Sequence, residues 1–383
     1  IITTMAIDNK DKKILNVPHL RFPEFSGEWE MVSLQDIATI NPKSDPLQNT
    51  FIYIDLEAVE KGELRKIQEI MREEAPSRAQ RVIDNNDILF QCVRPYQKNN
   101  YIHRILNTSN QQWVASTGYA QIRTTELPNY IYHLLNTDEF NRKVMVRCTG
   151  SSYPAINSED LATIHLYYTP DKKEQLKISR LLDLLDKRIA TQNKIIEKLQ
   201  SLIKGLRVCC MQRVYGNNVY LSEIAQIYQP QTISSTELTE DGFLVYGANG
   251  IIGKYKDYNH ETEQICITCR GNTCGMVNYT KPMSWITGNA MVINTDKYQD
   301  KVCKRYLYHY LSAYNFNSII SGSGQPQIVR TPLEKLKITL PTISEQKQKA
   351  IIFDKIQDKI DINHKVLNLY IGQKQYLLRQ MFI

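Results

Sequence analysis

The chain has 383 residues with 42% hydrophobic and 23% charged side chains, which leaves room for two or more domains that each bury a core. Its formal net charge of +7 permits binding to a polyanion without requiring it. No run of about eighteen apolar residues occurs, and the N-terminus lacks the basic-then-apolar layout of a signal peptide. We therefore expect a cytoplasmic protein that does not enter a membrane.

Several segments of the first half return in the same order in the second half. The pairs are "VSLQDIATI" (32–40) and "VYLSEIAQI" (219–227), "STGYAQI" (116–122) and "ITGNAMV" (286–292), "YIYHLLNTDEF" (130–140) and "YLYHYLSAYNF" (306–316), and "TGSSYPAI" (149–156) and "SGSGQPQI" (321–328). Their offset varies between 170 and 187 residues, as expected for two copies of one unit with different loop insertions. The sequence therefore predicts a tandem duplication.

In the first copy, "DILFQCV" (87–93) is rich in apolar and aromatic residues and predicts a strand. The loops "APSRAQR" (75–81) and "VRPYQKNNYIHR" (93–104) carry Arg, Lys, Asn, Gln and Tyr, which are side chains that reach phosphates and read base edges. Their counterparts in the second copy, "YGANGIIGKYK" (246–256) and "CRGNTCG" (269–275), match only loosely. A duplicated scaffold with divergent polar loops favours ligand recognition by those loops.

The two Tyr-His segments, 130–140 and 306–316, place aromatic residues and Leu at helical spacing. We predict one helix of the repeated scaffold in each copy. Most of the aromatic residues belong to the core in this interpretation. His133 and His309 are then packed or hydrogen-bonded rather than catalytic.

Each copy ends in a long segment whose apolar residues follow steps of three and four, the pattern of a coiled-coil seam. The first set is Leu182, Leu185, Ile189, Gln192, Ile196, Leu199 and Ile203. The second set is Phe353, Ile356, Ile360, Asn363, Leu367, Tyr370 and Leu377. The polar position recurs as well, with Gln192 in one segment and Asn363 in the other. We predict two long helices that pack on each other antiparallel, with the globular units related by a pseudo-twofold axis.

Three cysteines in the second copy suggest a metal site, because Cys266 and Cys269 have the Cys-x-x-Cys spacing of zinc ligands and Cys274 follows closely. However, "QICITC" (264–269) is rich in β-branched residues and predicts a buried strand, in which positions three apart point to opposite faces. A second close cysteine pair is also missing, and only Cys303 and His260 remain as distant ligands. Free structural thiols are the favoured interpretation, and we predict no metal.

Catalytic signatures are absent from the sequence. "NPKS" (41–44) begins like the Asn/Asp-Pro-Pro-aromatic tetrad of amino methyltransferases and then departs from it. No phosphate-binding glycine loop of the Walker type occurs. We therefore predict no catalytic residue.

The motifs "LRFPEFSGEW" (20–29), "APSRAQR…DILFQCVRP" and "LPTISEQKQKAI" (340–351) together resemble the specificity (S) subunit of type I restriction-modification systems. The resemblance runs from residue 17 to the C-terminal helix. It implies two target-recognition domains, each reading one half of a bipartite double-stranded DNA site. It also implies helices that set the spacing between half-sites and dock two modification (methyltransferase) subunits. S-adenosylmethionine, ATP and Mg would act in those subunits and in the restriction (motor-nuclease) subunits, with no cofactor bound by this chain.

The expected architecture is α+β with five segments: an N-terminal extension (1–27), the first recognition domain (28–170), the first conserved helix (171–215), the second recognition domain (216–341) and the second conserved helix (342–383). Two alternative functions stay open from the residues alone. One is a coiled-coil scaffold that binds only protein, and the other is a DNA-modifying enzyme of unfamiliar type.

The predicted DNA-contacting residues lie in the divergent loops and in two glycine-containing turns. In the first domain they are Arg78, Gln80, Arg81, Arg94, Tyr96, Lys98, Asn99, Tyr101, Ser151, Ser152 and Tyr153. In the second domain they are Tyr246, Asn249, Lys254, Arg270, Asn272, Thr273, Ser323 and Gln325. A structural alternative is that Arg94 and Arg270, which each follow a predicted strand, merely pair with carboxylates of their own domains.

Overall fold

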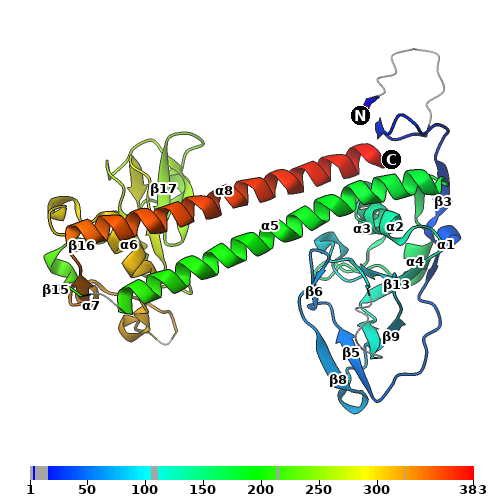
Figure 1. The fold of residues 1–383 in the computed structure, drawn as a ribbon, viewed down its shortest axis with the longest axis horizontal. Coiled ribbons are helices and arrows are strands. Elements are labelled where there is room, and N and C mark those ends of the chain that lie inside the picture. The colour runs from blue at the N-terminus through cyan, green and yellow to red at the C-terminus, as the bar shows by residue number, and fades with distance from the viewer. Residues whose placement is uncertain (1–2, 5–15, 105–110, 213–214, 323) are drawn as a thin grey trace. The chain divides into compact units, whose positions relative to one another are not determined.

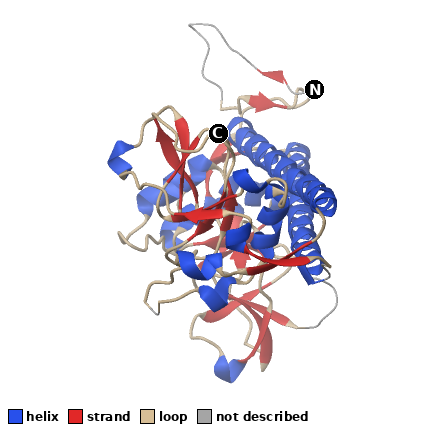
Figure 2. Cartoon of the chain, turned by 90° about the vertical axis from the view of Figure 1, so that its left-hand side faces the viewer, coloured by secondary structure: helices blue, strands red, loops and turns tan. Residues whose placement is uncertain are grey.

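The computed structural model describes residues 3–4, 16–104, 111–212, 215–322 and 324–383. It divides into two compact units, one formed by Ile1–Thr191 with Leu367–Ile383 and the other by Gln192–Val366. Each unit combines short strands, short helices and long loops, and is of the α+β class (Figure 2). Within the described ranges, no helix combines the length and the apolar character needed to cross a membrane.

The first unit is built on two four-stranded sheets. One has the order β11 (Tyr101–Ile102), β10 (Ile88–Gln91), β13 (Tyr119–Thr124), β4 (Ala38–Ile40), and all its pairs are antiparallel. The other has the order β8 (Gln68–Met71), β5 (Thr50–Ile54), β12 (Gln112–Ser116), β9 (Ala79–Ile83), in which β5 and β12 are parallel. The remaining elements are β1 (Thr3–Thr4), β2 (Leu20–Arg21), β3 (Glu30–Ser33), β6 (Val59–Glu60), β7 (Glu63–Leu64), β14 (His165–Tyr168), α1 (Leu34–Ile37), α2 (Pro128–Leu135), α3 (Asp138–Arg147), α4 (Ser158–Ala162), η1 (Arg72–Glu74) and η2 (Pro95–Gln97).

The second unit repeats this plan with fewer strands. Its first sheet has the order β16 (Gln226–Tyr228), β22 (Ala290–Asn294), β19 (Ile265–Thr268), β20 (Val277–Tyr279), and its second has the order β18 (Gly250–Tyr255), β17 (Phe243–Gly247), β21 (Ser284–Ile286). Strands β17 and β21 are parallel, like β5 and β12. The remaining elements are β15 (Asn217–Tyr220), β23 (Lys337–Leu340), α6 (Lys304–Ala313), α7 (Arg330–Glu334), η3 (Leu221–Glu223), η4 (Ser235–Glu237), η5 (Asp296–Tyr298) and η6 (Phe316–Ile319).

The two strands predicted from sequence are present as β10 and β19. They occupy equivalent places in the two antiparallel sheets, β11-β10-β13-β4 and β20-β19-β22-β16. Strand β10 pairs with β13, and β19 pairs with β22. The two cysteines of the Cys-x-x-Cys segment are buried in different core clusters, because Cys266 packs with Tyr246 and Ile286 whereas Cys269 packs with Ile267 and Met291. The strand geometry expected for this segment is thus confirmed.

Two long helices, α5 (Lys172–Gln212) and α8 (Ile343–Met381), carry the predicted heptads (Figure 1). In the second unit, Ile203 of α5 forms a buried cluster with Phe353 and Ile360 of α8. In the first unit, Leu182 and Leu185 of α5 belong to one core with residues at the end of α8. All seam positions are buried or half-buried, as the heptad pattern predicts.

A polar layer interrupts the apolar seam of the second unit. Gln192 Nε2 donates to Asn363 Oδ1 at 2.5 Å and to the backbone carbonyl of Asn363 at 3.2 Å. Both side chains are less than a tenth exposed. Asn363 Nδ2 in turn donates to the carbonyl of Lys359 at 2.6 Å, so both the oxygen and the nitrogen of the Asn363 side chain have partners.

The recurring Tyr-His segments dock each domain onto a long helix. His133 Nε2 lies 2.8 Å from Asp183 Oδ1 of α5, and His309 Nε2 lies 2.8 Å from Asp354 Oδ1 of α8. The two aspartates are 171 residues apart, the same offset as the two seams. Burial lowers the pKa of both histidines, so each ring is neutral and donates its Nε2 hydrogen to the carboxylate.

A second contact of the same kind lies at the start of each long helix. The side-chain oxygen of Gln175 accepts from the backbone N–H of Leu127 at 3.2 Å, and that of Gln346 accepts from Cys303 at 2.8 Å. Leu127 and Cys303 are the residues that immediately precede α2 and α6. Each domain helix is therefore fixed at two points on its long helix, eight residues apart along the latter.

The structure differs from the prediction of one helix for each Tyr-His segment. Helix α2 ends at Leu135, and Thr137 begins α3 by accepting a hydrogen bond from the N–H of Phe140 at 3.2 Å. In the second unit, α6 ends at Ala313 before a 3-10 turn. The side-chain cap at Thr137 stops one helix and starts another, a local signal that the apolar spacing obscures.

Candidate nucleic-acid interface

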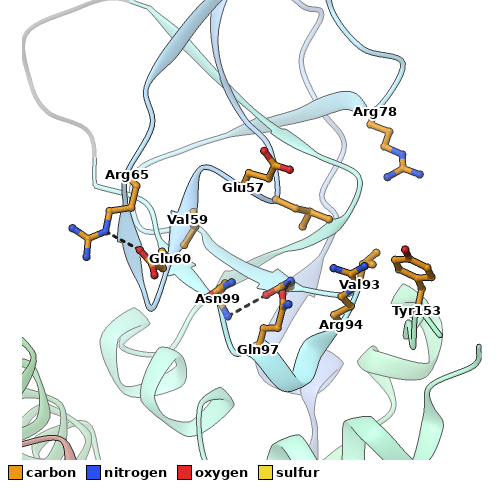
Figure 3. A pocket seen from close by; sticks show the side chains of 12 residues that line it. Glu57, Val59, Glu60, Arg65, Arg78, Val93, Arg94, Gln97, Asn99 and Tyr153 are labelled. Carbon is orange, nitrogen blue, oxygen red and sulfur yellow. Dashed lines mark hydrogen bonds and ion pairs between the residues drawn. The ribbon is translucent and has the colours of Figure 1, made fainter. Parts of the chain in front are cut away.

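A cavity of about 750 Å³ opens at the end of β10 in the first unit (Figure 3). Four parts of the chain bring its lining together: the end of β10 with the turn after it, the β6–β7 hairpin with the loop before it, the loop before β9, and the loop before α4. The lining residues are Leu56, Glu57, Val59, Glu60, Arg65, Arg78, Gln91, Val93, Arg94, Gln97, Asn99 and Tyr153. Four of the sequence-predicted DNA contacts, Arg78, Arg94, Asn99 and Tyr153, are thus brought to one cavity.

The buried side-chain amide of Gln91 stabilises the turn after β10. Gln91, which is 2% exposed, accepts from the N–H of Asn99 through its Oε1 at 3.1 Å and donates through its Nε2 to Gln97 Oε1 at 3.0 Å. The backbone N–H of Gln91 donates to Asn100 Oδ1 at 2.8 Å. These bonds close a tight turn whose polar tip points into the cavity.

Arg94 begins this turn in a left-handed backbone conformation, with φ of 54°. Its guanidinium carbon lies 4.3 Å from the ring centroid of Tyr153, which comes from the loop before α4 (Figure 3). Tyr153 is 63% exposed. The Arg94 N–H donates to the carbonyl of Pro154 at 2.7 Å and so ties the two segments together. The stacked pair presents a cation and an aromatic ring at the rim of the cavity.

Three arginines of the first domain make no side-chain hydrogen bond or ion pair with any described residue: Arg78, Arg81 and Arg94. The other arginines between residues 28 and 170 all have such partners, and Arg65 pairs with Glu63 at 3.0 Å. Arg81 is half-buried, and its Nε has no acceptor among the residues described. Burial lowers the pKa of Arg81. Cations without internal partners are suited to an external anion.

The remaining predicted residues of the first domain lie in varied surroundings. Lys98 pairs with Asp138 at 2.7 Å, on the side facing α3. Tyr101 is half-buried and packs against the core cluster that contains Ile54 and Leu89, and burial raises the pKa of its hydroxyl. The side chains of Gln80, Tyr96, Ser151 and Ser152 are exposed.

In the second unit, Arg270 is exposed and forms no ion pair with any described residue. Lys254 pairs with Asp241 at 3.0 Å. Tyr246 is only 6% exposed, and its hydroxyl accepts from the N–H of Lys281 at 3.1 Å. Asn249, Asn272 and Gln325 are exposed, Thr273 is half-buried, and Ser323 lies outside the described residues.

Gln91 and Gln97 line the cavity but were not among the predicted contacts. Gln91 stands inside the predicted strand, where a polar residue in a run of apolar neighbours is the available signal. The buried side-chain amide of Gln91 needs hydrogen-bond partners, and it finds them in the turn that follows the strand. Its role as the support of the turn therefore depends on tertiary structure.

The family model for the type I restriction modification DNA specificity domain matches residues 26–201 and again residues 217–369. The chain belongs to this family. The two matches coincide with the two copies of the repeat. The arginine-lined cavity falls within the first matched range, and the seam residues fall within the two ranges except Ile203, Tyr370 and Leu377.

Relatives in the family match parts of the chain. The type I restriction enzyme EcoprrI specificity subunit of Escherichia coli is 31% identical over 147 residues, 37% of this chain and 36% of that protein. The type I restriction enzyme HindI specificity subunit of Haemophilus influenzae is 23% identical over 186 residues, 47% of this chain and 37% of that protein. The matched segments span little more than a third of these relatives.

Solved structures share the fold over most of the chain. The type I restriction-modification S subunit from M. genitalium has a TM-score of 0.66 at 15% identity, covering 96% of this chain and 99% of that one. A chain from a structure of complex assembly and conformational transition of the type I R-M system has a TM-score of 0.56 at 20% identity, covering 91% and 96%. The specificity-subunit fold thus extends beyond the segments matched in sequence.

Proposed function

We propose that this chain is the sequence-specific DNA-binding specificity subunit of a type I restriction-modification complex, with each recognition domain reading one half of a bipartite site. The observation that carries the proposal is a set of three arginines, Arg78, Arg81 and Arg94, whose side chains form no hydrogen bond or ion pair with any described residue. Two of them, Arg78 and Arg94, line the open cavity. Phosphates and guanine edges are the natural acceptors for such side chains.

The long helices have the role of a spacer in this proposal. Within the second unit, Gln192 contacts Asn363, and Ile203 packs with Phe353 and Ile360, so sequence positions rise on α5 as they fall on α8. Within the first unit, Asp186 meets Lys374 at 2.5 Å, which follows the same trend. Within each unit, these contacts support antiparallel packing of the two helices along the heptad seam.

The chemistry belongs to partner subunits in this proposal. Two modification subunits, which use S-adenosylmethionine, dock on the helices, and restriction subunits add DNA cleavage driven by ATP with Mg. The complex acts in the cytoplasm, where its DNA substrate is found. The specificity chain supplies recognition and spacing and carries no catalytic group.

The test is a binding titration of duplex DNA by the chain, alone and with its cognate modification subunit, over a range of salt concentrations. We expect the affinity to fall linearly with salt on logarithmic axes, and Arg78→Ala and Arg81→Ala each to lower the slope by about 1 where the side chain meets a phosphate. Arg142→Ala is the matched control, because Arg142 is exposed and already pairs with Glu139 at 2.8 Å. A chain that assembles with the modification subunit but gives no salt-dependent DNA binding would be a protein scaffold and would overturn the proposal.

A further inference from the structure

The two recognition domains share one backbone frame at the turn after their equivalent strands. In the first domain, Ile156 N–H donates to the carbonyl of Cys92 at 3.1 Å, and Arg94 N–H donates to that of Pro154 at 2.7 Å. In the second, Ile328 donates to Cys269 at 3.0 Å, and Gly271 donates to Pro326 at 2.9 Å. By these bonds the counterpart of Arg94 is Gly271 and not Arg270.

The loops that meet these turns are equivalent as well. Gly150 has φ of +88° and Gly322 has φ of +92°. A Cβ atom at Gly150 would lie 3.0 Å from the carbonyl oxygen of Tyr153, and one at Gly322 would lie 2.5 Å from that of Gln325. Tyr153 and Gln325 therefore occupy the same place in the two loops, each directly before a proline.

The two domains share this backbone arrangement but carry different side chains on it. The first domain displays Arg94 and Tyr153, and the second displays Gly271 and Gln325 at the same positions. Arg94 and Gly271 both have a positive φ, 54° and 83° respectively, which glycine adopts freely and arginine does not. An arginine kept in an unfavourable backbone conformation, with no acceptor among the described residues, points to a role for its side chain.

The chemistry of the pair favours a particular base. The guanidinium of Arg94 lies over the Tyr153 ring at 4.3 Å, which limits its orientation. A planar guanidinium held in this way matches the O6 and N7 acceptors of guanine in the major groove with two parallel hydrogen bonds. Glycine at the same position offers no side chain, and the glutamine amide prefers adenine.

We propose that these two exchanged positions set the base preference of each domain, and that Arg94, positioned by Tyr153, reads a guanine in the first half-site. The inference rests on the proposed function, since it requires that the domains contact DNA. The second domain, with Gly271 and Gln325, does not read guanine at the equivalent position.

The experiment is selection from duplex libraries with both half-sites randomised, using the chain assembled with its modification subunits. The wild-type complex should select a bipartite site with an invariant G·C pair in one half. Arg94→Gly is the informative variant, because glycine accepts the left-handed backbone and the domain stays folded. It should reduce the preference for G·C at that one position by about 5- to 150-fold and leave the preferences in the other half-site unchanged.

Two further arms separate the possible outcomes. In the wild-type complex, 7-deazaguanine at the selected position should weaken binding by part of the loss that Arg94→Gly causes, because it removes the N7 acceptor and keeps O6. It should have no added effect on the variant. Tyr153→Ala should relax the same position partly, while Tyr153→Phe, which keeps the ring, should not. The exposed, ion-paired Arg142→Ala variant should select the wild-type site.

A uniform loss of affinity for all sequences in Arg94→Gly would identify a phosphate contact and overturn the proposal. Relaxation of both half-sites together would overturn it as well. Failure of the wild-type complex to select any bipartite site, with normal assembly, would instead refute the proposed function itself. Thermal unfolding of each variant checks that the recognition domains remain folded.

Discussion

The polar layer between Gln192 and Asn363 makes a quantitative prediction about the helix seam. Asn363→Leu removes the Oδ1 acceptor at 2.5 Å and leaves Gln192 Nε2 with only the backbone carbonyl at 3.2 Å. A buried amide that loses its partner costs about 1–3 kcal/mol of folding free energy. Leucine returns part of this through apolar burial, so we expect a net loss of about 1 kcal/mol.

The reverse substitution has a similar effect for a related reason. Gln192→Leu leaves Asn363 Oδ1 without its donor, while Asn363 Nδ2 keeps its bond to Lys359 at 2.6 Å. The expected net loss is again about 1 kcal/mol. The double leucine variant has no stranded amide and two more apolar side chains in the seam. It should therefore be at least as stable as the wild type, which gives a coupling energy of about 2 kcal/mol.

The measurement is a double-mutant cycle from urea denaturation, followed by the helical circular dichroism signal of the full chain. Gln200→Leu is the control for helix propensity, since Gln200 is exposed on α5. Stability losses that simply add in the double variant would show that the two amides are not coupled, and the seam alignment would then be wrong. A polar layer of this kind fixes register at a cost in stability. The double variant should therefore tolerate DNA spacers that the wild-type complex rejects.

Three further predictions concern the packing of the units. Ile360→Lys places a charge at a position that is 3% exposed and should destabilise the second unit by several kcal/mol in thermal unfolding. The control Ile362→Lys, at a position 52% exposed on the same helix, should change stability by less than about 0.5 kcal/mol. Asp354→Asn removes the carboxylate that accepts from His309 at 2.8 Å, and should lower stability by about 2 kcal/mol and speed amide hydrogen exchange in α6; unchanged exchange would contradict the docking role. Burial lowers the pKa of His103 from 6.5 to about 4, so between these pH values the unfolded chain binds a proton that the folded chain does not. The free energy of unfolding should therefore fall by up to about 3 kcal/mol as the pH drops from 6.5 to 4, and His103→Phe should remove most of this pH dependence.

The sequence alone determined the duplication and the face that each long helix buries. A heptad repeat is a local pattern, and burial along a helix follows directly from its period. Leu185 is 5% exposed while its neighbour Leu184 is 60% exposed, although the two side chains are chemically identical. The family resemblance rested on motifs of the same local kind.

The tertiary structure decided which polar side chains are free to bind a ligand. Tyr246 lies in a loop-like sequence of glycine and asparagine, yet it is buried because β17 pairs with both β18 and β21. Lys98 and Lys254 are engaged by carboxylates 40 and 13 residues away in the chain. No local pattern encodes such partners, because they depend on which segments the fold brings together.

The equivalence of the two recognition surfaces was decided in the same way. In the sequence, Arg94 and Arg270 look like counterparts, since each follows a strand. The backbone hydrogen bonds instead pair Arg94 with Gly271, one position further along. Both positions require a positive φ, which glycine adopts freely and arginine adopts only under strain, so the two residues do not look equivalent in the sequence. Register between distant segments is set by hydrogen bonds that form only in the folded domain, and for that reason the structure had to decide it.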